Sequence, residues 1–526
     1  MTPSALLDRP SPAVAAVEPP EAVPLPARLL RFVVAVAVAA PIAAYLWVAA
    51  HRLGYPYELD WMEGGSVALA ARAAAGHSLY VAPSLAYVGW TYPPLYYWVA
   101  AAVSKVTGVG FFALRLLSLT ASLAAMATLG ALVWRETQDR VAGLVAAGLF
   151  AATFVISGAW FDTGRVDSLF IALTLLTLAW GRRARGVPGG MGLGALAFLA
   201  FFTKQTALVA VLPALLYLGA SRPRVGIPAL LMLLGLVGVS TVGLDAASHG
   251  WYRYYVFSEL SGQSWAQQVW MSFWENDIWR RQWPLVALLA AGGAGLWWEA
   301  RERVSWRSPA AYHVVAAAGL ILSAWLSRLH TGGFLNVLMP AYAALALLGG
   351  LVYGAVARRE RDRPRGWRSW TGALVALALL AQVALLAYRP AAQIPTSAQR
   401  ATGATLIAGL RSLPGPAIVL RHPWYATLAG RGSSAAQEEA IHDVLRSSAA
   451  RGARVLRASL AHALDAERVQ SVVLDYAGDG SLLGPEFMRE FRLQRAPITR
   501  SRLYPLTDLR TAPVLVYLRE PRPSAR

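Results

Sequence analysis

The stretch Tyr57–Trp98 reads YELDWMEGGSVALAARAAAGHSLYVAPSLAYVGWTYPPLYYW. It follows the first long apolar segment of the chain and places three carboxylates, Glu58, Asp60 and Glu63, within about two helical turns. Acidic side chains are costly near hydrocarbon, and in a polytopic membrane protein they usually mark a functional site. We therefore expect this stretch to be a water-facing loop that carries the functional face of a membrane protein.

The composition of the whole chain supports a membrane location. Of the 526 residues, 56% are apolar and only 15% are charged, whereas soluble domains are about a quarter charged. The 20 Trp and 20 Tyr residues are typical of interfacial belts, where an amphipathic ring lies at the depth of the lipid headgroups. The composition therefore predicts a mainly α-helical, polytopic membrane protein.

The net charge of +19 does not indicate a nucleic-acid partner. The arginines gather in short clusters between apolar segments, as residues that set membrane topology do. The chain has no cysteine, which excludes disulfides, thiolate zinc sites and a cysteine nucleophile. It has two lysines, Lys105 and Lys204, so a lysine in an apolar setting is unusual here.

The N-terminal region contains a tail and then a first span. Residues 1–27 are rich in Pro and Ala without an apolar period, which predicts a disordered tail. Phe32–Ala50 follows Arg28 and Arg31 and is long enough to cross a hydrocarbon core of about 30 Å. A cleaved signal peptide is the alternative, but the long preceding tail and the many later spans favour an uncleaved anchor. Either interpretation makes 51–98 an outer loop.

Further apolar segments bring the predicted number of transmembrane helices to about eleven. The 190–203 segment is short, and the alternative is a re-entrant pair with its neighbour. The predicted spans after the first are 111–134, 141–159, 168–181, 190–203, 206–219, 225–244, 284–298, 311–327, 334–355 and 370–388.

The distribution of arginine predicts the orientation of these spans. With the N-terminus in the cytoplasm, every inner loop is arginine-rich, as the positive-inside rule requires, although Arg253, Arg280 and Arg281 reduce the contrast with the outer loops. The C-terminal part then lies outside the cytoplasm. The inner-loop arginines are Arg135, Arg140, Arg182, Arg183, Arg185, Arg222, Arg224, Arg301, Arg303, Arg307 and the six from Arg358 to Arg368.

The outer parts have their own predicted structure. Gly64–Gly76 has the pattern of a helix lying on the membrane surface, and the prolines of TYPPLYYW at 91–98 predict an interfacial turn. Within residues 391–526, the short apolar runs Ala417–Leu420, Val469–Leu474 and Val514–Leu518 alternate with charged helical stretches such as Ala435–Arg457. This pattern predicts a small C-terminal α/β domain after a transmembrane domain at 28–390.

Four patches that share the predicted outer side carry candidate chemistry. The first is ELDWMEGG at 58–65, where Glu58, Asp60 or Glu63 could deprotonate a hydroxyl or orient a metal; the alternative is that they solvate the end of a span. The second is FDTGRVDS at 161–168. Its Arg165 has the planar donor fork that binds phosphate, flanked by Asp162 and Asp167, while the alternative is a local ion-pair cluster.

The third and fourth patches add cationic groups. In TKQT at 203–206, Lys204 can hold a lipid-linked phosphate with Gln205 as a hydrogen-bonding neighbour, or it can simply extend to the interface. In SRLHTGGFLN at 327–336, Arg328 and His330 add cationic or proton-handling groups and Asn336 begins the next span; the alternative is a polar loop with a glycine hinge.

Several other chemistries lack their sequence motifs. There is no HExxH and no histidine set with ligand spacing, so the sequence does not require a metal, although a divalent ion is compatible with it. There is no GxGxxG, no GxxxxGK[ST] and no GxSxG, which argues against nucleotide hydrolysis and an α/β-hydrolase elbow.

Taken in order, these patches resemble those of the polytopic GT-C class of glycosyltransferases. The similarity is strongest to bacterial dolichol-phosphate-mannose-protein-mannosyltransferase-like and aminoarabinose-transferase-like enzymes, and it covers about residues 30–390. It implies transfer of a sugar from a polyprenyl-phosphate donor, with inversion, outside the bacterial cytoplasmic membrane, to a lipid, glycan or protein acceptor. Many relatives have adjacent Asp and Glu in the first outer loop, whereas here Trp61 and Met62 separate Asp60 from Glu63.

The resemblance suggests roles for individual residues. Asp60 or Glu63 would be the base, Arg165 and Lys204 would bind phosphate, and Glu58 and His330 would be secondary. Tyr92 and Tyr96 of the aromatic turn would stack on the sugar or guide the prenyl chain. Two other classes remain open: a transporter or flippase of a lipid-linked or small anionic substrate, and an assembly protein without catalytic carboxylates.

Overall fold

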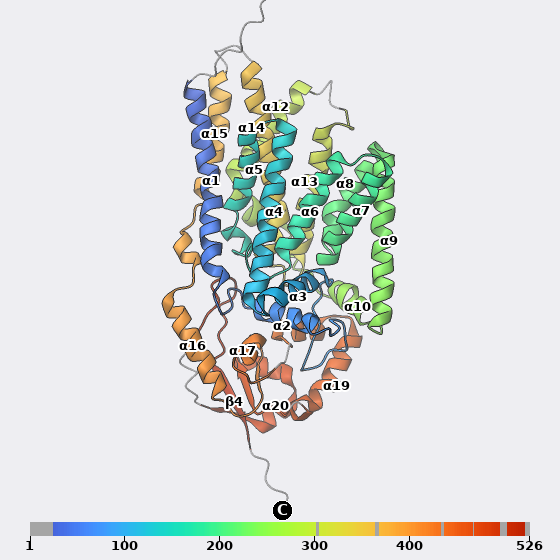
Figure 1. Cartoon of the computed structure of the whole chain (residues 1–526), viewed down its shortest axis with the longest axis vertical. Helices are drawn as coiled ribbons and strands as arrows, with labels where there is room; N and C mark the ends of the chain where they lie inside the picture. Colours follow the sequence, from blue (N-terminus) through green and yellow to red (C-terminus); the bar gives the residue numbers. More distant parts are fainter. Residues whose placement is uncertain are drawn as a thin grey trace, which may run out of the picture.

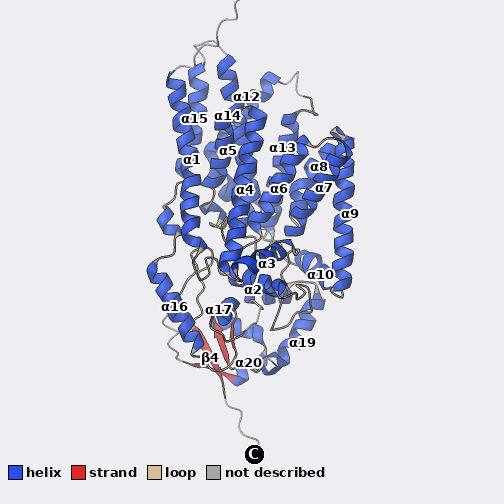
Figure 2. Ribbon diagram, viewed as in Figure 1, coloured by secondary structure: helices blue, strands red, loops and turns tan. Residues whose placement is uncertain are grey.

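The computed structural model describes residues 25–300, 305–362, 368–432, 436–466, 468–494 and 502–520. Long helices run side by side along the long axis, and a smaller part with a sheet lies beyond one end of them (Figure 1 and Figure 2). The predicted fold class, a mainly helical polytopic membrane protein with a small C-terminal α/β part, is confirmed. Most of the predicted tail at 1–27 lies outside the described residues.

Each of the eleven predicted spans overlaps a helix of the bundle. Six helices are long and apolar enough to cross a membrane, or up to seven if α15 and the bent segment after it count as one span. The predicted span 141–159 is too long, because α5 ends at Ala152 and a 3-10 turn follows. The bundle helices are α1 (Leu25–Leu53), α4 (Phe111–Thr137), α5 (Arg140–Ala152), α6 (Asp167–Arg183), α7 (Gly186–Thr203), α8 (Ala207–Ser221), α9 (Pro223–Ala247), α12 (Arg280–Ala300), α13 (Pro309–Leu329), α14 (Met339–Asp362) and α15 (Arg368–Leu385).

Small residues allow these helices to pack closely. A Cβ on Gly148 of α5 would overlap the Val38 carbonyl of α1, and one on Gly226 of α9 would overlap the backbone of Gly219 in α8. Close approach through Gly and Ala is the usual way in which membrane helices associate, because lipid supplies no hydrophobic driving force between them. The most apolar part of α14 is 83% buried, which places this helix at the centre of the bundle.

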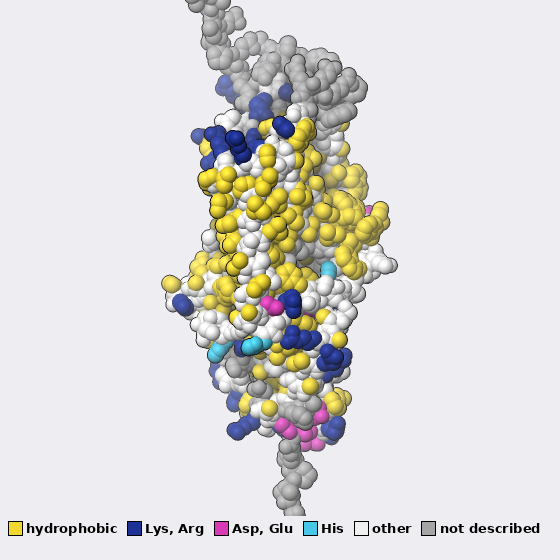
Figure 3. Space-filling view, turned by 90° about the vertical axis from the view of Figure 1, so that its right-hand side faces the viewer, with side chains coloured by type: hydrophobic (Ala, Val, Ile, Leu, Met, Phe, Trp, Pro, Cys, Tyr) yellow, Lys and Arg dark blue, Asp and Glu magenta, His cyan; other side chains and the backbone are white. Residues whose placement is uncertain are grey.

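The surface of the bundle has a broad apolar band. On the face that Figure 3 shows, hydrophobic side chains cover the middle of the bundle, and a group of Lys and Arg side chains lies at the end away from the sheet. This arrangement agrees with a hydrocarbon-facing belt and a basic end. The cytoplasmic location of that end stays a prediction. Arg301, Arg303 and two of the six arginines between Arg358 and Arg368 lie outside the described residues.

Short elements lie at the other end of the bundle. The predicted helix of the first outer loop forms as α2 (Glu63–Ala74), but its residues 63–70 are buried, so it does not lie on an exposed surface as predicted. The helix α3 (Leu95–Thr107), which the sequence did not predict, begins directly after the two prolines of the aromatic turn. Between α9 and α12 the chain forms α10 (Trp251–Arg253), the π-helical η2 (Tyr254–Glu259), α11 (Val269–Ser272) and the π-helical η3 (Phe273–Trp279). η4 (Leu335–Leu338) precedes α14.

The C-terminal part contains one four-stranded sheet in the order β1-β2-β4-β3. β1 and β2 are parallel, with Ala417 opposite Ser471, and β4 is antiparallel to both β2 and β3. The three predicted strands are confirmed, and β3 was missed because FRLQ is only four residues long. The strands are β1 (Ala417–Val419), β2 (Ser471–Leu474), β3 (Phe491–Gln494) and β4 (Leu515–Arg519).

Helices surround this sheet and connect it to the bundle. α16 begins with a capping box in which Thr396 and Gln399 satisfy each other's backbone amides. The predicted helical stretch Ala435–Arg457 forms two helices rather than one. The helices of this part are η5 (Pro390–Gln393), α16 (Ser397–Arg411), α17 (Pro423–Leu428), α18 (Glu438–Arg446), α19 (Ala450–Ala466), η6 (Ala477–Leu483) and α20 (Pro485–Glu490).

The first outer loop and the C-terminal part share one hydrophobic core. Leu59 and Val67 belong to the same buried cluster as Leu406 and Val472. A Cβ on Gly403 would overlap the ring of Tyr57, so α16 packs tightly on the loop. The loop carboxylates are therefore enclosed between the bundle and the C-terminal part.

Candidate active site

The three carboxylates of the first outer loop are all buried, but each has a different environment. Glu58, Asp60 and Glu63 are at most 1% exposed. A buried carboxylate needs a cation or several hydrogen-bond donors to stay ionised. The partners of the three carboxylates come from segments that are distant in the sequence. Because these partners differ, each carboxylate has a different role.

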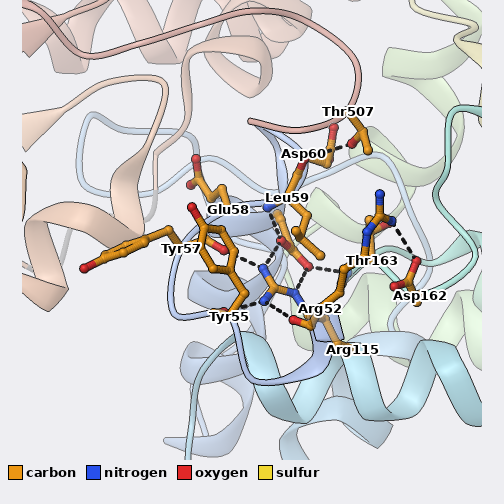
Figure 4. Close-up of polar contacts among 12 residues, drawn as sticks. Arg52, Tyr55, Tyr57, Glu58, Leu59, Asp60, Arg115, Asp162, Thr163 and Thr507 are labelled. Atoms are coloured by element: carbon orange, nitrogen blue, oxygen red, sulfur yellow. Dashed lines mark hydrogen bonds and ion pairs between the residues drawn. The ribbon is translucent and has the colours of Figure 1, made fainter. Parts of the chain in front are cut away.

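Glu63 is held by four hydrogen bonds. Its Oε1 accepts from Arg115 Nε at 2.8 Å and from the Gly164 amide at 2.7 Å, while its Oε2 accepts from Arg115 Nη2 at 2.6 Å and from the Leu59 amide at 2.9 Å. Arg115, from α4, also donates to the carbonyls of Arg52, Tyr55 and Tyr57 (Figure 4). The pair therefore fixes the path of the loop, and both oxygens of Glu63 already accept two hydrogen bonds each.

Asp60 is partly satisfied. Its Oδ2 accepts from Arg165 Nη1 at 3.1 Å, whereas its Oδ1 has no hydrogen-bond partner among the described residues. Burial raises the pKa of Asp60 well above its usual value; Arg165 opposes this effect and nearby carboxylates add to it. Asp60 thus has a free oxygen and a raised proton affinity, the two properties expected of a general base.

Glu58 joins the loop to the C-terminal part through a histidine. His422 bonds to Glu58 Oε2 through Nδ1 and to Asp475 Oδ2 through Nε2, the latter at 3.0 Å. Burial raises the pKa of Glu58 to about 7, against the opposing effect of His422. Although burial lowers the pKa of His422, Glu58 and then Asp475 raise it to about 10. A protonated imidazole between two carboxylates therefore ties the two parts together.

The second outer loop supplies Arg165 from a strained turn. Gly158 and Ala159 both have positive φ, 78° and 58°, and the Ala159 carbonyl accepts from Arg52 at 2.9 Å. A left-handed alanine costs roughly 1–2 kcal/mol, and such strain is concentrated at functional sites. Asp162 pairs with Arg52 Nη1 at 3.1 Å (Figure 4), so its role here is to anchor the turn.

Lys204 and Asn336 come together on Asp167, the first residue of α6. Lys204 Nζ lies 2.7 Å from Asp167 Oδ1, and Asn336 Nδ2 donates to the same oxygen at 2.9 Å. Lys204 Nζ also lies 5.7 Å from the centre of the Tyr92 ring. Although burial opposes it, Asp167 raises the pKa of Lys204, so the ammonium group stays charged.

The other predicted residues have different surroundings. Gln205 Nε2 donates to the carbonyls of Thr91 and Val256, which holds the aromatic turn. The Tyr96 hydroxyl lies 3.3 Å from Ser118 Oγ and is buried. His330 packs against Trp265, with ring centres 5.9 Å apart. No contact links it to Asp60, Arg165 or Lys204 within the described part of the chain, so its role as a secondary group of the site stays a prediction.

Five important residues were not singled out from the sequence: Arg52, Arg115, His422, Asp475 and Asp508. Arg115 is the one arginine inside the predicted span 111–134. A cation in an apolar span is a usable signal, because it requires a buried partner. The other four lie in segments whose local sequence shows no pattern that points to the loop.

One group of side chains in the described residues has a geometry that could hold a metal. Glu438, Glu439 and His442 of α18 offer ligand atoms within 4.8 Å of one another. Both carboxylates already pair with arginines, Glu438 with Arg421 at 3.0 Å and Glu439 with Arg446 at 2.9 Å. These ion pairs account for the cluster.

Residues 91–244 match the family model described as dolichyl-phosphate-mannose-protein mannosyltransferase. The resemblance predicted from the sequence is confirmed over these residues. They contain the aromatic turn, the second outer loop with Arg165, and Lys204. No curated protein matches the chain.

Two solved structures are similar to the chain at low sequence identity. ArnT from Cupriavidus metallidurans bound to undecaprenyl phosphate is 15% identical, with 74% of this chain and 84% of that chain covered and a TM-score of 0.49. The oligosaccharyltransferase from Archaeoglobus fulgidus tethered with an acceptor peptide is 11% identical, with 83% and 69% covered and a TM-score of 0.45.

Proposed function

We propose that this protein is a membrane glycosyltransferase that transfers a sugar from a polyprenyl-phosphate donor to a hydroxyl-bearing acceptor, with inversion at the anomeric carbon. The observation that carries the proposal is the Asp60–Arg165 pair, whose salt bridge leaves one oxygen of Asp60 without a partner among the described residues. The family model matched by residues 91–244 is named for a polyprenyl-phosphate sugar, which supports this class of donor.

Asp60 is the base in this proposal. It must accept the proton of the attacking hydroxyl, and its Oδ1 is the acceptor atom without a partner among the described residues. Glu63 is saturated by Arg115 and two backbone amides. Glu58 is occupied by His422. A base within hydrogen-bond reach contributes about 10²- to 10⁴-fold to the rate.

Arg165 and Lys204 bind the departing phosphate. Arg165 Nε has no hydrogen-bond partner among the described residues, so the guanidinium can donate to a phosphate oxygen while it keeps its bond to Asp60. Lys204 is oriented by Asp167 and adds a second charge. Cations placed where negative charge develops stabilise the transition state without reorganisation.

The reaction then balances as a single displacement. The acceptor oxygen forms a bond to the anomeric carbon as the bond from that carbon to the phosphate oxygen breaks, and the bonding electron pair leaves with the phosphate. The acceptor proton moves to Asp60. Since phosphate is already a good leaving group, the site needs cations rather than a general acid.

The membrane placement belongs to the same proposal. We place the loop, the site and the C-terminal part (391–526) on the outer side of the cytoplasmic membrane, with the transmembrane domain at 28–390. The donor's prenyl chain would stay in the bilayer, and Tyr92 and Tyr96 would guide it so that the phosphate reaches Arg165 and Lys204. The acceptor is a lipid, a glycan or a protein.

A transfer assay in lipid vesicles tests the proposal. Purified protein is given a polyprenyl phosphate that carries a radiolabelled sugar, together with membrane extracts as a source of acceptors. We expect loss of label from the donor and its appearance in an acceptor fraction. Movement of intact donor between leaflets without cleavage would instead identify a flippase. If neither transfer nor movement is observed, the result would favour an assembly protein.

A further inference from the structure

A segment near the C-terminus crosses the loop that carries Asp60. The Thr507 amide and the Thr507 hydroxyl both donate to the Leu59 carbonyl, at 2.9 Å each. Thr507 forms an isolated parallel bridge with Asp60, and Figure 4 shows the two residues side by side. The C-terminal part therefore reaches the candidate base itself, rather than only the outside of the loop.

The next residue, Asp508, is held in an unusual conformation. Its φ of 64° lies in the left-handed region, which Asp and Asn tolerate better than other side chains that carry a Cβ. Its Oδ2 accepts from Trp61 Nε1 at 3.0 Å. Trp61 is fully buried and directly follows Asp60. A backbone held in this region points from an observed outlier toward a functional constraint.

We propose that Asp508 is a positioning residue of the transfer site: through its bond to Trp61 it fixes the loop that carries Asp60, and it places a negative charge beside that loop. The inference rests on the proposed function, because it assigns Asp508 a part in setting the charge state of the base. A neutral acceptor would satisfy the indole equally well, so the carboxylate charge is the feature that needs this explanation.

The electrostatics of the cluster agree with this role. The charged groups around Asp60 are Arg165 from the second outer loop, Asp508 from the C-terminal part, and Glu63 and Glu58 from its own loop. Burial is the largest cause of the raised pKa of Asp60, and Arg165 opposes it. The three carboxylates raise this pKa further. Burial raises the pKa of Asp508, while Trp61 and Arg165 lower it and Glu439 raises it. A second carboxylate near a buried carboxyl favours retention of a proton on the buried one.

Two variants separate the effect of the negative charge of Asp508 from the effect of its hydrogen bond to Trp61. Asp508→Asn keeps an acceptor for Trp61 and tolerates positive φ, but it removes the charge. Asp508→Gly also tolerates the positive φ, but it removes both the acceptor for Trp61 and the charge. Glu520→Gln is the matched control, because Glu520 is a half-exposed carboxylate of the same C-terminal region that pairs with Arg492 at 3.3 Å.

The pH profile of transfer tests the charge. Activity should rise with pH as Asp60 loses its proton, and removal of a like charge lowers the pKa of Asp60. In Asp508→Asn the acid limb of kcat/KM should therefore move to lower pH by roughly one unit, whereas Glu520→Gln should match the wild type. An unmoved limb in Asp508→Asn would overturn the proposal.

Amide hydrogen exchange tests, without any transfer assay, whether Asp508 holds the loop that carries Asp60 in place. The Thr507 amide, bonded to the Leu59 carbonyl, should exchange at least tenfold faster in Asp508→Gly than in the wild type, and Asp508→Asn should stay close to the wild type. Equal exchange in the Gly variant and the wild type overturns the positioning role, whether or not the protein transfers sugar. Absence of transfer in the wild type with this exchange pattern intact would contradict the proposed function instead.

Discussion

Glu63 and Arg115 form a buried ion pair whose role is to hold the first outer loop in place. Both side chains are almost fully buried, and the pair satisfies five groups of the surrounding chain. When one partner of such a pair is neutralised, the other is left as an uncompensated charge, which typically costs about 3–5 kcal/mol. Glu63 is therefore expected to matter for stability first.

For Glu63→Gln we expect a loss of about 3–5 kcal/mol in stability, measured as a fall in the thermal unfolding midpoint in detergent. Glu275→Gln is the control, because its pair with Arg280 is solvent-exposed and should change stability little. Unchanged stability together with abolished transfer would return Glu63 to the position of candidate base.

His422 makes the attachment of the C-terminal part dependent on pH. The pKa of His422 is raised from its usual 6.5 to about 10 in the folded protein. A group whose folded pKa is raised stabilises the fold fully below its unfolded pKa, and this stabilisation is lost as the pH rises through the folded value. The relevant window is therefore from pH 6.5 to about 10.

Across that window the unfolding temperature of the wild type should fall, because His422 stops contributing on the order of 5 kcal/mol. His422→Gln should be less stable at pH 6.5 and should show a flatter pH dependence. The measurement is a series of melting curves between pH 6 and 10. Parallel curves for the two proteins would show that the imidazole is not charged between Glu58 and Asp475.

The sequence identified Asp60, Arg165, Lys204, Asp167 and Asn336 as candidates, because carboxylates and cations beside long apolar segments are unusual. The sequence could not show which of the three loop carboxylates is the base. Their difference depends on Arg115 and His422, which lie 52 and 364 residues away in the chain. No local pattern encodes such pairings, so the roles appear only once the fold brings the partners together.

At the scale of elements, glycine spacing decides how the helices pack. Gly226 and Gly238 both lie on α9, but a Cβ on Gly226 would overlap the backbone of Gly219 on α8, while nothing lies within 4 Å of a Cβ on Gly238. The two positions have similar helix-propensity effects. They differ in packing alone.

We expect Gly226→Val to destabilise the bundle by about 1–3 kcal/mol or more through overpacking, and Gly238→Val to be close to neutral. Thermal unfolding of the two variants in the same detergent measures the difference. An equal effect at both positions would show that α8 and α9 do not pack closely at this point.

Most elements were predictable from apolar periodicity, and the exceptions have physical reasons. The spans coincide with helices because each is a long apolar run. α5 stops at Ala152, and a 3-10 turn followed by the positive-φ residues Gly158 and Ala159 leads into the second outer loop. β3 was missed because it is only four residues long, so its alternation of two apolar and two polar residues is too short to indicate a strand.

At the scale of the whole molecule, the proposed topology places the sheet and the basic end of the bundle on opposite sides of the membrane. The chain has no cysteine, so single-cysteine reporters have no background. Ser481 in the C-terminal part and Gln138 between α4 and α5 are both exposed.

In right-side-out vesicles, a membrane-impermeant maleimide should label Ser481→Cys and leave Gln138→Cys unlabelled until the vesicles are opened. Labelling of Gln138→Cys alone would invert the topology. Labelling of both in sealed vesicles would contradict the placement of a bilayer around the apolar band.

The sequence also predicted a domain boundary near residue 390, yet the hydrophobic core does not stop there. Leu59 and Val67 of the first outer loop pack in one cluster with Leu406 and Val472. Composition reports a change from membrane to soluble character, whereas packing between distant segments has no compositional signature. This is why the contribution of Thr507 and Asp508 to the site could not be foreseen.

The most direct test of the account is the effect of Asp60→Asn on transfer and on donor binding, measured in the same preparation. The neutral amide is nearly isosteric and can still accept from Arg165, so the donor should bind within about threefold of the wild-type affinity. Transfer should fall by about 10²- to 10⁴-fold. Transfer at the wild-type rate in Asp60→Asn would contradict the account, because the reaction would then need no base at this position.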